Sequence, residues 1–186
     1  MTATTLDEKS ALIVIDLQKG IVALPAAHPI DGVVKNVAAL AEAFRARGLP
    51  VVLVNVAGMA PGRTEQPRRG GAFPAGWTDL IPDLNQQPQD LLVTKMTPGA
   101  FTGTGLDAHL KSLGVTQVVV VGVSTSNGVE VTARQAFELG FNVTLATDAM
   151  TDMNAEAHAY STAKVFPRIG ETGTTREIIG LLDKRT

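Results

Sequence analysis

The chain has 186 residues, of which 45% are hydrophobic and 18% charged, and it contains no cysteine. Because domains average ~150 residues, we expect a single domain spanning residues 1–186. With a formal net charge of −2, the chain lacks the basic excess that attraction to phosphate backbones needs, so we expect no nucleic-acid partner. The lack of cysteine excludes disulfides, thiolate metal ligands and cysteine nucleophiles. No apolar stretch approaches the ~18 residues of a membrane span and the first residues resemble no signal peptide, so we expect a cytoplasmic protein with no membrane partner.

Runs rich in β-branched residues alternate with helical patterns along the chain. In chain order, strands are predicted at residues 11–15, 51–56, 91–94, 117–121 and 142–147, and helices at residues 33–47, 105–113, 128–139, 154–165 and 174–182. The predicted strands are continuous apolar runs, which are typical of a parallel sheet covered by helices on both faces. The predicted fold class is therefore α/β, with a central, mostly parallel sheet in three layers.

The segment at residues 57–90 fits neither pattern and is rich in Gly, Pro, Arg and Gln. A loop of this length inside a compact domain is usually functional or mobile. Its arginines Arg63, Arg68 and Arg69 could clamp a carboxylate, although arginines in a loop are more often simply solvated.

Two charged residues follow predicted strands at the position where open parallel sheets bind ligands. Asp16 comes directly after the first strand and Lys95 after the third. Taken singly, Asp16 is either a local cap or an acid/base carboxylate, and Lys95 is typical of a surface lysine with a packed stem. As a pair they would face one crevice and titrate as a coupled unit.

The turn at residues 122–128 joins the fourth strand to the next helix and is made of glycine and small polar residues. Such a turn suits the close approach of an anionic ligand or an oxyanion. Ordinary capping of the helix by Ser124, Thr125 or Ser126 explains it equally well, and composition does not separate the two interpretations.

No cofactor and no metal are expected. The three histidines, His28, His109 and His158, are too far apart in sequence to form a ligand pair. Residues 103–108 fit the pattern G-x-G-x-x-A, but the preceding strand ends well upstream and no acidic residue lies ~20 residues further on. A dinucleotide site is therefore not predicted.

Motifs in the order of one known family span residues 11–182, and the chain resembles the isochorismatase-like hydrolase superfamily. They are the segment 11–18 with Asp16, Lys95 followed by Gly99, Ala100 and Phe101, the turn from Gly122 to Thr125 with Val129, Thr132, Ala133 and Ala136, and the segment 143–149 with Asp148. The resemblance implies a three-layer α/β/α sandwich with about six strands. It also implies a homodimer or homotetramer and a non-proline cis peptide between Val123 and Ser124.

Most members of that superfamily are cysteine hydrolases, including nicotinamidases and N-carbamoylsarcosine amidases, with an Asp, Lys and Cys triad. The resemblance places the Asp on Asp16, the Lys on Lys95 and the Cys position on Gly128. Glycine at that position is the pattern of the isochorismatase branch, which cleaves the vinyl ether of isochorismate without a covalent enzyme intermediate. In that branch Asp16 would protonate the enol-ether carbon, Lys95 would orient the substrate carboxylate, and Gly128 would leave space for the substrate.

The remaining predicted substrate-binding residues are Ser124, Thr125, Ser126, Phe101 and Arg69. The isochorismatase branch carries a glutamine after the second strand and an aromatic residue in the turn. Here the matching positions hold Gly58 and Ser124. At these two positions the chain departs from the pattern of the isochorismatase branch.

Three hypotheses for the function follow. The first is a hydrolase that acts through Asp16 and Lys95 on a small carboxylated metabolite, as in vinyl-ether hydrolysis. The second is an amidase whose nucleophile has moved to Ser124 or Ser126. The third is a non-catalytic protein that binds a small molecule, against which the retention of both charged residues argues, since a buried ion pair has little value for stability.

Overall fold

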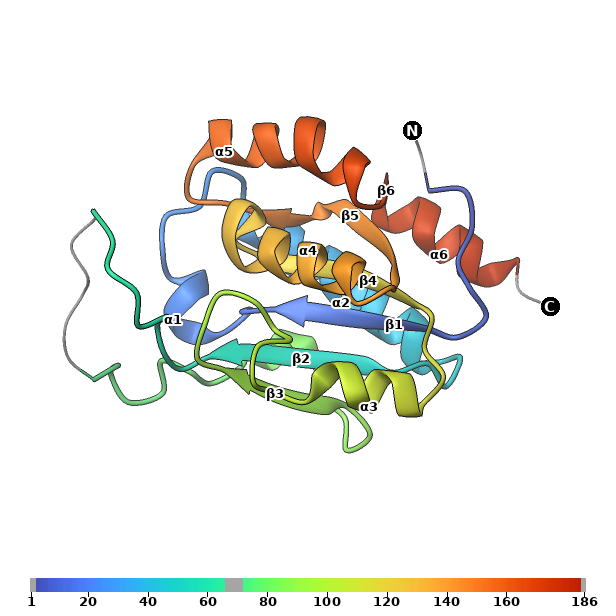
Figure 1. The fold of residues 1–186 in the computed structure, drawn as a ribbon, viewed down its shortest axis with the longest axis horizontal. Coiled ribbons are helices and arrows are strands. Elements are labelled where there is room, and N and C mark those ends of the chain that lie inside the picture. Colours follow the sequence, from blue (N-terminus) through green and yellow to red (C-terminus); the bar gives the residue numbers. More distant parts are fainter. Residues whose placement is uncertain (1–2, 66–71, 185–186) are drawn as a thin grey trace.

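The computed structural model describes residues 3–65 and 72–184, and a six-stranded sheet forms its middle layer (Figure 1). All five pairs of neighbouring strands are parallel, in the order β3-β2-β1-β4-β5-β6. The strands are β1 (Ser10–Ile15), β2 (Val51–Val56), β3 (Leu91–Lys95), β4 (Gln117–Val123), β5 (Asn142–Thr151) and β6 (Glu171–Gly173). The predicted α/β class and the parallel sheet are confirmed.

Helices cover both faces of the sheet, with α2 and α6 on one side and α3, α4 and α5 on the other (Figure 1). The helices are α1 (Lys19–Val22), α2 (Ile30–Arg45), α3 (Leu106–Ser112), α4 (Glu130–Glu138), α5 (Ala155–Tyr160) and α6 (Thr175–Asp183). Two π-helical turns, Thr125–Val129 and Ser161–Val165, and two 3-10 helices, Pro82–Leu84 and Phe166–Arg168, complete the elements. Among the described residues, no helix combines the length and hydropathy needed to cross a membrane.

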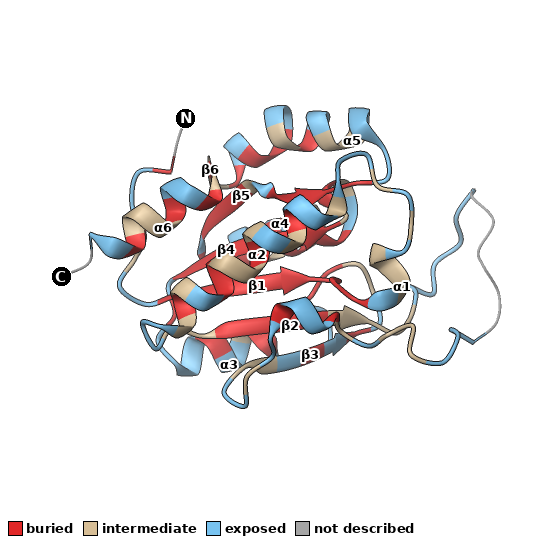
Figure 2. Ribbon diagram, turned by 180° about the vertical axis from the view of Figure 1, so that it is seen from behind, coloured by how far each residue is buried: buried red, intermediate tan, exposed pale blue. Residues whose placement is uncertain are grey.

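Two apolar clusters, one on each face of the sheet, make up the core. All six residues of β1 are buried, and successive side chains point to opposite faces, so Ile13 packs in one cluster and Leu12 in the other. Figure 2 shows the central strands as buried and the outer surfaces of the helices as exposed. This double burial explains why the strand sequences are continuous apolar runs rather than alternating ones.

Some boundaries differ from the prediction. The register between β4 and β5 shifts between Val120 and Gly122, and after this irregularity pairing resumes and continues to Thr151, so β5 is longer than predicted. Strand β6 has three residues and the helix α1 has four, and neither gives a periodic signal that a sequence reading can detect. Within its described residues, the long loop contains a short 3-10 helix, and its Leu80 forms an antiparallel bridge with Gln18.

The strand order places a topological switch point between β1 and β4. From β1 the chain builds β2 and β3 on one side, then returns to place β4 on the other side of β1. Ligands of open α/β sheets bind beyond the carboxyl ends of the strands at such a point. The residues that follow β1 and β4 are Asp16 and the turn at residues 124–129, so the topology itself points to this edge.

Candidate active site

Asp16 and Lys95 form a buried ion pair at the carboxyl edge of the sheet. Asp16 Oδ2 lies 2.8 Å from Lys95 Nζ, although the strands that carry these residues are separated by β2. Asp16 is 6% exposed and Lys95 is 1% exposed. Lys95 Nζ also donates a hydrogen bond of 2.9 Å to the carbonyl oxygen of Pro98, which fixes its head group. The structure thus brings together the two predicted catalytic residues.

Burial dominates the electrostatics of Asp16. Desolvation raises the pKa of Asp16 from 3.8 to about 6, and the ammonium of Lys95 lowers it by less than burial raises it. The second carboxyl oxygen, Asp16 Oδ1, is buried without a hydrogen-bond partner, and so is Thr97 Oγ1, two residues beyond Lys95. A carboxyl group in this state can carry a proton near neutral pH and has an oxygen free to meet a ligand.

Gly128 lies directly against this carboxyl group. A Cβ atom placed on Gly128 would be 3.2 Å from Asp16 Oδ2 and 2.9 Å from Ile15 Cγ2. Any side chain here would therefore stand over the Asp16–Lys95 pair. The position assigned to the nucleophile by resemblance is thus adjacent to the acid, and glycine keeps that space free of a side chain.

The turn after β4 begins with a cis peptide bond between Val123 and Ser124, as the resemblance implies. The carbonyl oxygen of Ser124 accepts hydrogen bonds from the backbone N–H groups of Asn127 and Val129, which closes the π-helical turn. Thr125 is fully buried, and a hydrogen bond of 2.8 Å joins its hydroxyl to His158 Nδ1. Ser124 and Thr125, two of the predicted substrate-binding residues, therefore make contacts that hold the turn in its conformation.

Ser126 is held by Asp152, the first residue after β5. The backbone N–H and the hydroxyl of Ser126 donate to Asp152 Oδ2 at 2.7 and 2.8 Å. The strand predicted at residues 142–147 ends four residues before β5 does, so the prediction places Asp148 rather than Asp152 at the strand end. In the structure Asp148 Oδ1 accepts hydrogen bonds from the backbone and hydroxyl of Thr175 at the start of α6. Asp152 could have been found only by extending β5 by four residues.

Two histidines, far apart in sequence, meet behind this turn. The rings of His28 and His158 have their centroids 4.6 Å apart, and His28 Nδ1 lies 3.0 Å from Thr151 Oγ1. Burial and the neighbouring His28 lower the pKa of His158, while Asp152 raises it. Because His28 and His158 are 130 residues apart in the sequence, no local pattern predicts their contact, and only the tertiary structure reveals it.

Thr132 links the loop after β3 to the turn after β4. Its buried hydroxyl donates to the carbonyl oxygen of Gly128 at 2.6 Å and accepts from the N–H of Ala100 at 3.1 Å. Both segments border the Asp16–Lys95 pair, so one side chain holds the two sides of the site together.

Replacing this hydroxyl should destabilise the protein measurably. We expect Thr132→Val to lower the free energy of unfolding by about 2 kcal/mol, because Val keeps the shape but leaves a buried N–H unpaired. Thr132→Ser keeps the hydroxyl and should lose about 1 kcal/mol or less. Urea unfolding of the three proteins provides the measurement, and equal midpoints for Val and wild type would contradict the role given to this bond.

Gln18 ties the long loop to the sheet beside Asp16. Its amide nitrogen donates to the carbonyl oxygens of Val56 and Trp77 at 3.1 and 3.3 Å, and its carbonyl oxygen accepts from the N–H of Val56 at 2.7 Å. The ring of Trp77 stacks on that of Phe73 with centroids 4.0 Å apart. Neither ring is among the predicted site residues, although Trp77 is the only tryptophan in the chain.

Of two further predicted site residues, Phe101 is part of the core and Arg69 is not among the described residues. The ring of Phe101 is 8% exposed and lies in a core cluster, with its centroid 6.0 Å from that of Phe141. Arg69 lies outside the described residues, as does its neighbour Arg68. Within residues 3–65 and 72–184, no group of three or more His, Cys, Asp or Glu side chains is arranged to hold a metal ion.

Comparisons with known proteins agree with this architecture. The profile of the Isochorismatase domain family matches residues 10–177. The isochorismatase family protein YwoC of Bacillus subtilis (strain 168) is 40% identical over 183 residues, with 92% of this chain and 93% of YwoC covered. Nicotinamidase 3 of Arabidopsis thaliana is 34% identical over 156 residues, with 80% of this chain and 76% of that protein covered.

Solved structures extend the likeness to the whole fold. An isochorismatase family protein from Burkholderia thailandensis is similar with a TM-score of 0.92 and 38% identity, covering 97% of this chain and 98% of that chain. The fold, the residues at the strand ends and the sequence similarity therefore indicate the same class of protein, the isochorismatase-like hydrolases. The chain belongs to the isochorismatase family of hydrolases, and it is a member without cysteine.

Proposed function

We propose that the protein is a hydrolase that cleaves an enol ether in a small carboxylated metabolite, with Asp16 as the proton donor and Lys95 as the residue that orients the substrate carboxylate. The observation that carries the proposal is the buried pair itself, with Asp16 Oδ1 unpartnered and Gly128 lying against the Oδ2 side of the same carboxyl group. A nucleophilic mechanism needs a side chain at that point, whereas protonation of carbon needs a raised carboxyl pKa and room for the substrate.

The proposed chemistry balances without a covalent enzyme intermediate. Asp16 transfers its proton to the terminal carbon of the enol ether, and the adjacent carbon becomes an oxocarbenium ion. Water adds to that carbon and loses a proton, which restores the acid form of Asp16. The resulting hemiketal expels the alcohol, so a carboxylated enol ether such as isochorismate yields pyruvate and a dihydroxy acid.

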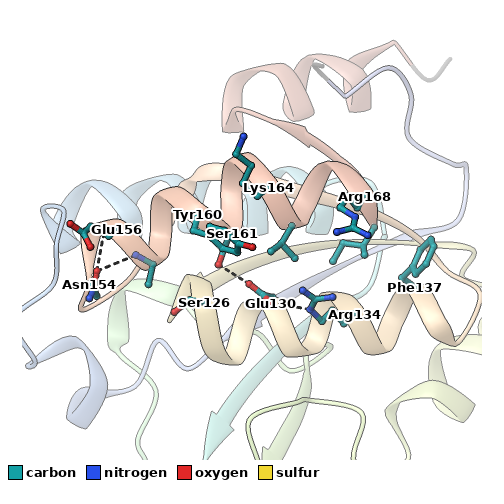
Figure 3. A pocket seen from close by; sticks show the side chains of 13 residues that line it. Ser126, Glu130, Arg134, Phe137, Asn154, Glu156, Tyr160, Ser161, Lys164 and Arg168 are labelled. Carbon is teal, nitrogen blue, oxygen red and sulfur yellow. Dashed lines mark hydrogen bonds and ion pairs between the residues drawn. The ribbon is translucent and has the colours of Figure 1, made fainter.

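The amidase alternative is supported by the likeness to Nicotinamidase 3, a relative whose name states an amide substrate. A serine in the turn would have to supply the nucleophile. The hydroxyl of Ser126 donates a hydrogen bond to Asp152. Ser126 itself lines a groove between α4 and α5 on the outer surface, as Figure 3 shows. The vinyl-ether proposal therefore accounts for more of the observed contacts.

The experiment that tests the proposal measures two products in parallel. Purified protein is incubated with isochorismate and, separately, with a panel of small primary amides including nicotinamide. Pyruvate is read in the first reaction and ammonia in the second. Release of pyruvate supports the proposal. Release of ammonia that is lost in Ser126→Ala supports the amidase, and turnover of neither class contradicts the enol-ether assignment for these substrates.

The pH dependence follows from the raised pKa of Asp16. The acid form donates the proton, and it is populated below a pH of about 6. We therefore expect kcat/KM to be constant at acid pH and to fall about tenfold per pH unit above the pKa. Removing the charge in Lys95→Met would remove the interaction that lowers this pKa, so in any residual activity the fall should begin at higher pH. A rate that rises with pH would instead indicate a general base.

A further inference from the structure

The loop after β3 carries a buried hydroxyl group that the proposed mechanism does not use. Within residues 3–65 and 72–184, two buried side-chain polar atoms have no hydrogen-bond partner, Asp16 Oδ1 and Thr97 Oγ1. Both belong to residues that flank the ammonium group of Lys95, since Asp16 pairs with it through Oδ2 and Thr97 lies two residues beyond it. Buried polar atoms in native proteins nearly always have a partner, so each exception calls for an explanation. Two exceptions around one buried charge indicate a place where polar groups of a ligand bind.

The hydroxyl of Thr97 is directed away from solvent. The residue as a whole is half-buried, and its exposed surface belongs to atoms other than the hydroxyl oxygen, which is buried. A hydroxyl that leaves water without gaining a partner raises the free energy of the folded protein. A ligand that accepts a hydrogen bond from this hydroxyl would recover that free energy on binding.

The loop that carries Thr97 is fixed at both ends. The hydrogen bond of 2.9 Å from Lys95 Nζ to the carbonyl oxygen of Pro98 closes a ring that contains the backbone of Thr97. Pro98 also restricts the residue before it to extended backbone conformations. Beyond Pro98, the N–H of Phe101 donates to Gln135 Oε1 on α4 at 3.2 Å. The hydroxyl of Thr97 is therefore held in place before a ligand arrives, which lowers the entropy that binding costs.

Lys95 has one donor left for the same ligand. An ammonium group has three N–H donors. Asp16 Oδ2 at 2.8 Å and the carbonyl oxygen of Pro98 at 2.9 Å accept two of them, and no other acceptor among the described residues is bonded to Lys95 Nζ. The remaining N–H and the hydroxyl of Thr97 are two donors next to one positive charge. They match the two oxygens of a carboxylate, since hydrogen bonds to an ionised group are stronger than those between neutral groups.

We propose that the hydroxyl of Thr97 and the remaining N–H of Lys95 together bind the carboxylate of the substrate, with one donor to each oxygen. This inference rests on the proposed function, which supplies a small carboxylated metabolite, and it adds a second anchor for the carboxylate. A carboxylate held through both oxygens cannot turn about its contact with Lys95, so the reacting carbon keeps one position relative to Asp16. Thr97 is thus a residue that determines specificity for carboxylates and takes no part in the proton transfer.

The test is isothermal titration calorimetry of the full chain with pyruvate, the carboxylated product of the proposed reaction. Pyruvamide, in which a neutral amide replaces the carboxylate, is the matched ligand, and wild type should bind pyruvate about tenfold or more tightly than pyruvamide. Thr97→Val keeps the shape of the side chain and removes the donor, so it should weaken pyruvate binding about tenfold and leave pyruvamide binding unchanged. Thr97→Ser keeps the hydroxyl and should stay within about threefold of wild type.

Two controls separate binding from a structural role. Thr94→Val makes the same chemical change on an exposed residue of β3 and should leave pyruvate binding unchanged. Urea unfolding supplies the second control. Because Thr97 Oγ1 has no protein partner, Thr97→Val should unfold at the same urea concentration as wild type or at a higher one. Thr132→Val, which removes a hydroxyl with two partners, should unfold at a lower one.

Three results would overturn the proposal. They are equal affinity of wild type for pyruvate and pyruvamide, pyruvate binding that Thr97→Val leaves unchanged, and a loss of stability in Thr97→Val as large as that in Thr132→Val. Pyruvate binding that depends on the hydroxyl of Thr97 supports the carboxylate site even where no enol ether is turned over. The failure of the proposed activity and the failure of this inference can therefore be told apart.

Discussion

Asp16→Asn should reduce turnover of the enol-ether substrate by about 10²- to 10⁴-fold, the range that a positioned general acid contributes. Asparagine keeps the size of the side chain and can still accept from Lys95, but its amide cannot deliver a proton to carbon. Because Asp16 Oδ1 has no protein partner, the change removes no hydrogen bond from that oxygen. The loss should therefore appear chiefly in kcat rather than in KM, as measured by pyruvate release at a pH near 6.

A matched control is Asp183→Asn. Asp183 pairs with Arg47, and its side chain is 61% exposed on α6. Loss of an exposed ion pair has small effects, so turnover in this variant should stay close to that of wild type. Both variants should keep the circular dichroism of the native fold. Wild-type rates in Asp16→Asn would rule out Asp16 as the proton donor and leave Lys95 or the turn to be examined.

The parts of the fold that the sequence predicts well are those with local signals. The strand predicted at residues 51–56 coincides with β2 because a continuous apolar run is diagnostic when both faces are buried. Asp16 and Lys95 could be predicted as a pair because parallel strands bring their carboxyl ends to one edge, whatever the intervening chain does. The structure adds the distance between their charged atoms and shows that both side chains are buried.

The parts that escaped prediction depend on tertiary contacts. Asp152 and His158 contact the turn after β4 through Ser126 and Thr125. The first contact depends on where β5 ends, and the second requires α5 to pack beside that turn. Because the pairing between β4 and β5 is irregular, β5 extends beyond its predicted end, and the acidic residue that follows the strand is Asp152. No periodicity along the chain encodes such a shift, so the sequence pointed to Asp148 instead.

Gly122→Ala should destabilise the protein by more than about 3 kcal/mol, the largest effect on stability that we expect from a single methyl group. Gly122 pairs in register with Ile15, and its φ of +114° is one that side chains rarely adopt. An added Cβ would lie 2.1 Å from the carbonyl oxygen of Ile15 and 2.7 Å from its nitrogen. Backbone atoms in the middle of a sheet cannot yield as a flexible side chain can, so β1 and β4 must separate.

Gly140→Ala is the matched control for this change. Gly140 also has a positive φ, +88°, but nothing lies within 4 Å of an added Cβ. Its substitution isolates the conformational penalty, about 1 to 2 kcal/mol, from the steric clash. Comparable losses at the two positions in urea unfolding would contradict the close approach of β1 and β4. Because Asp16 directly follows Ile15, any separation of these strands also moves the carboxyl group away from Gly128. Gly122→Ala protein that still folds should therefore lose catalytic rate as well as stability. The close approach of Gly122 to Ile15 joins β1 to β4 at the switch point and also fixes the position of Asp16.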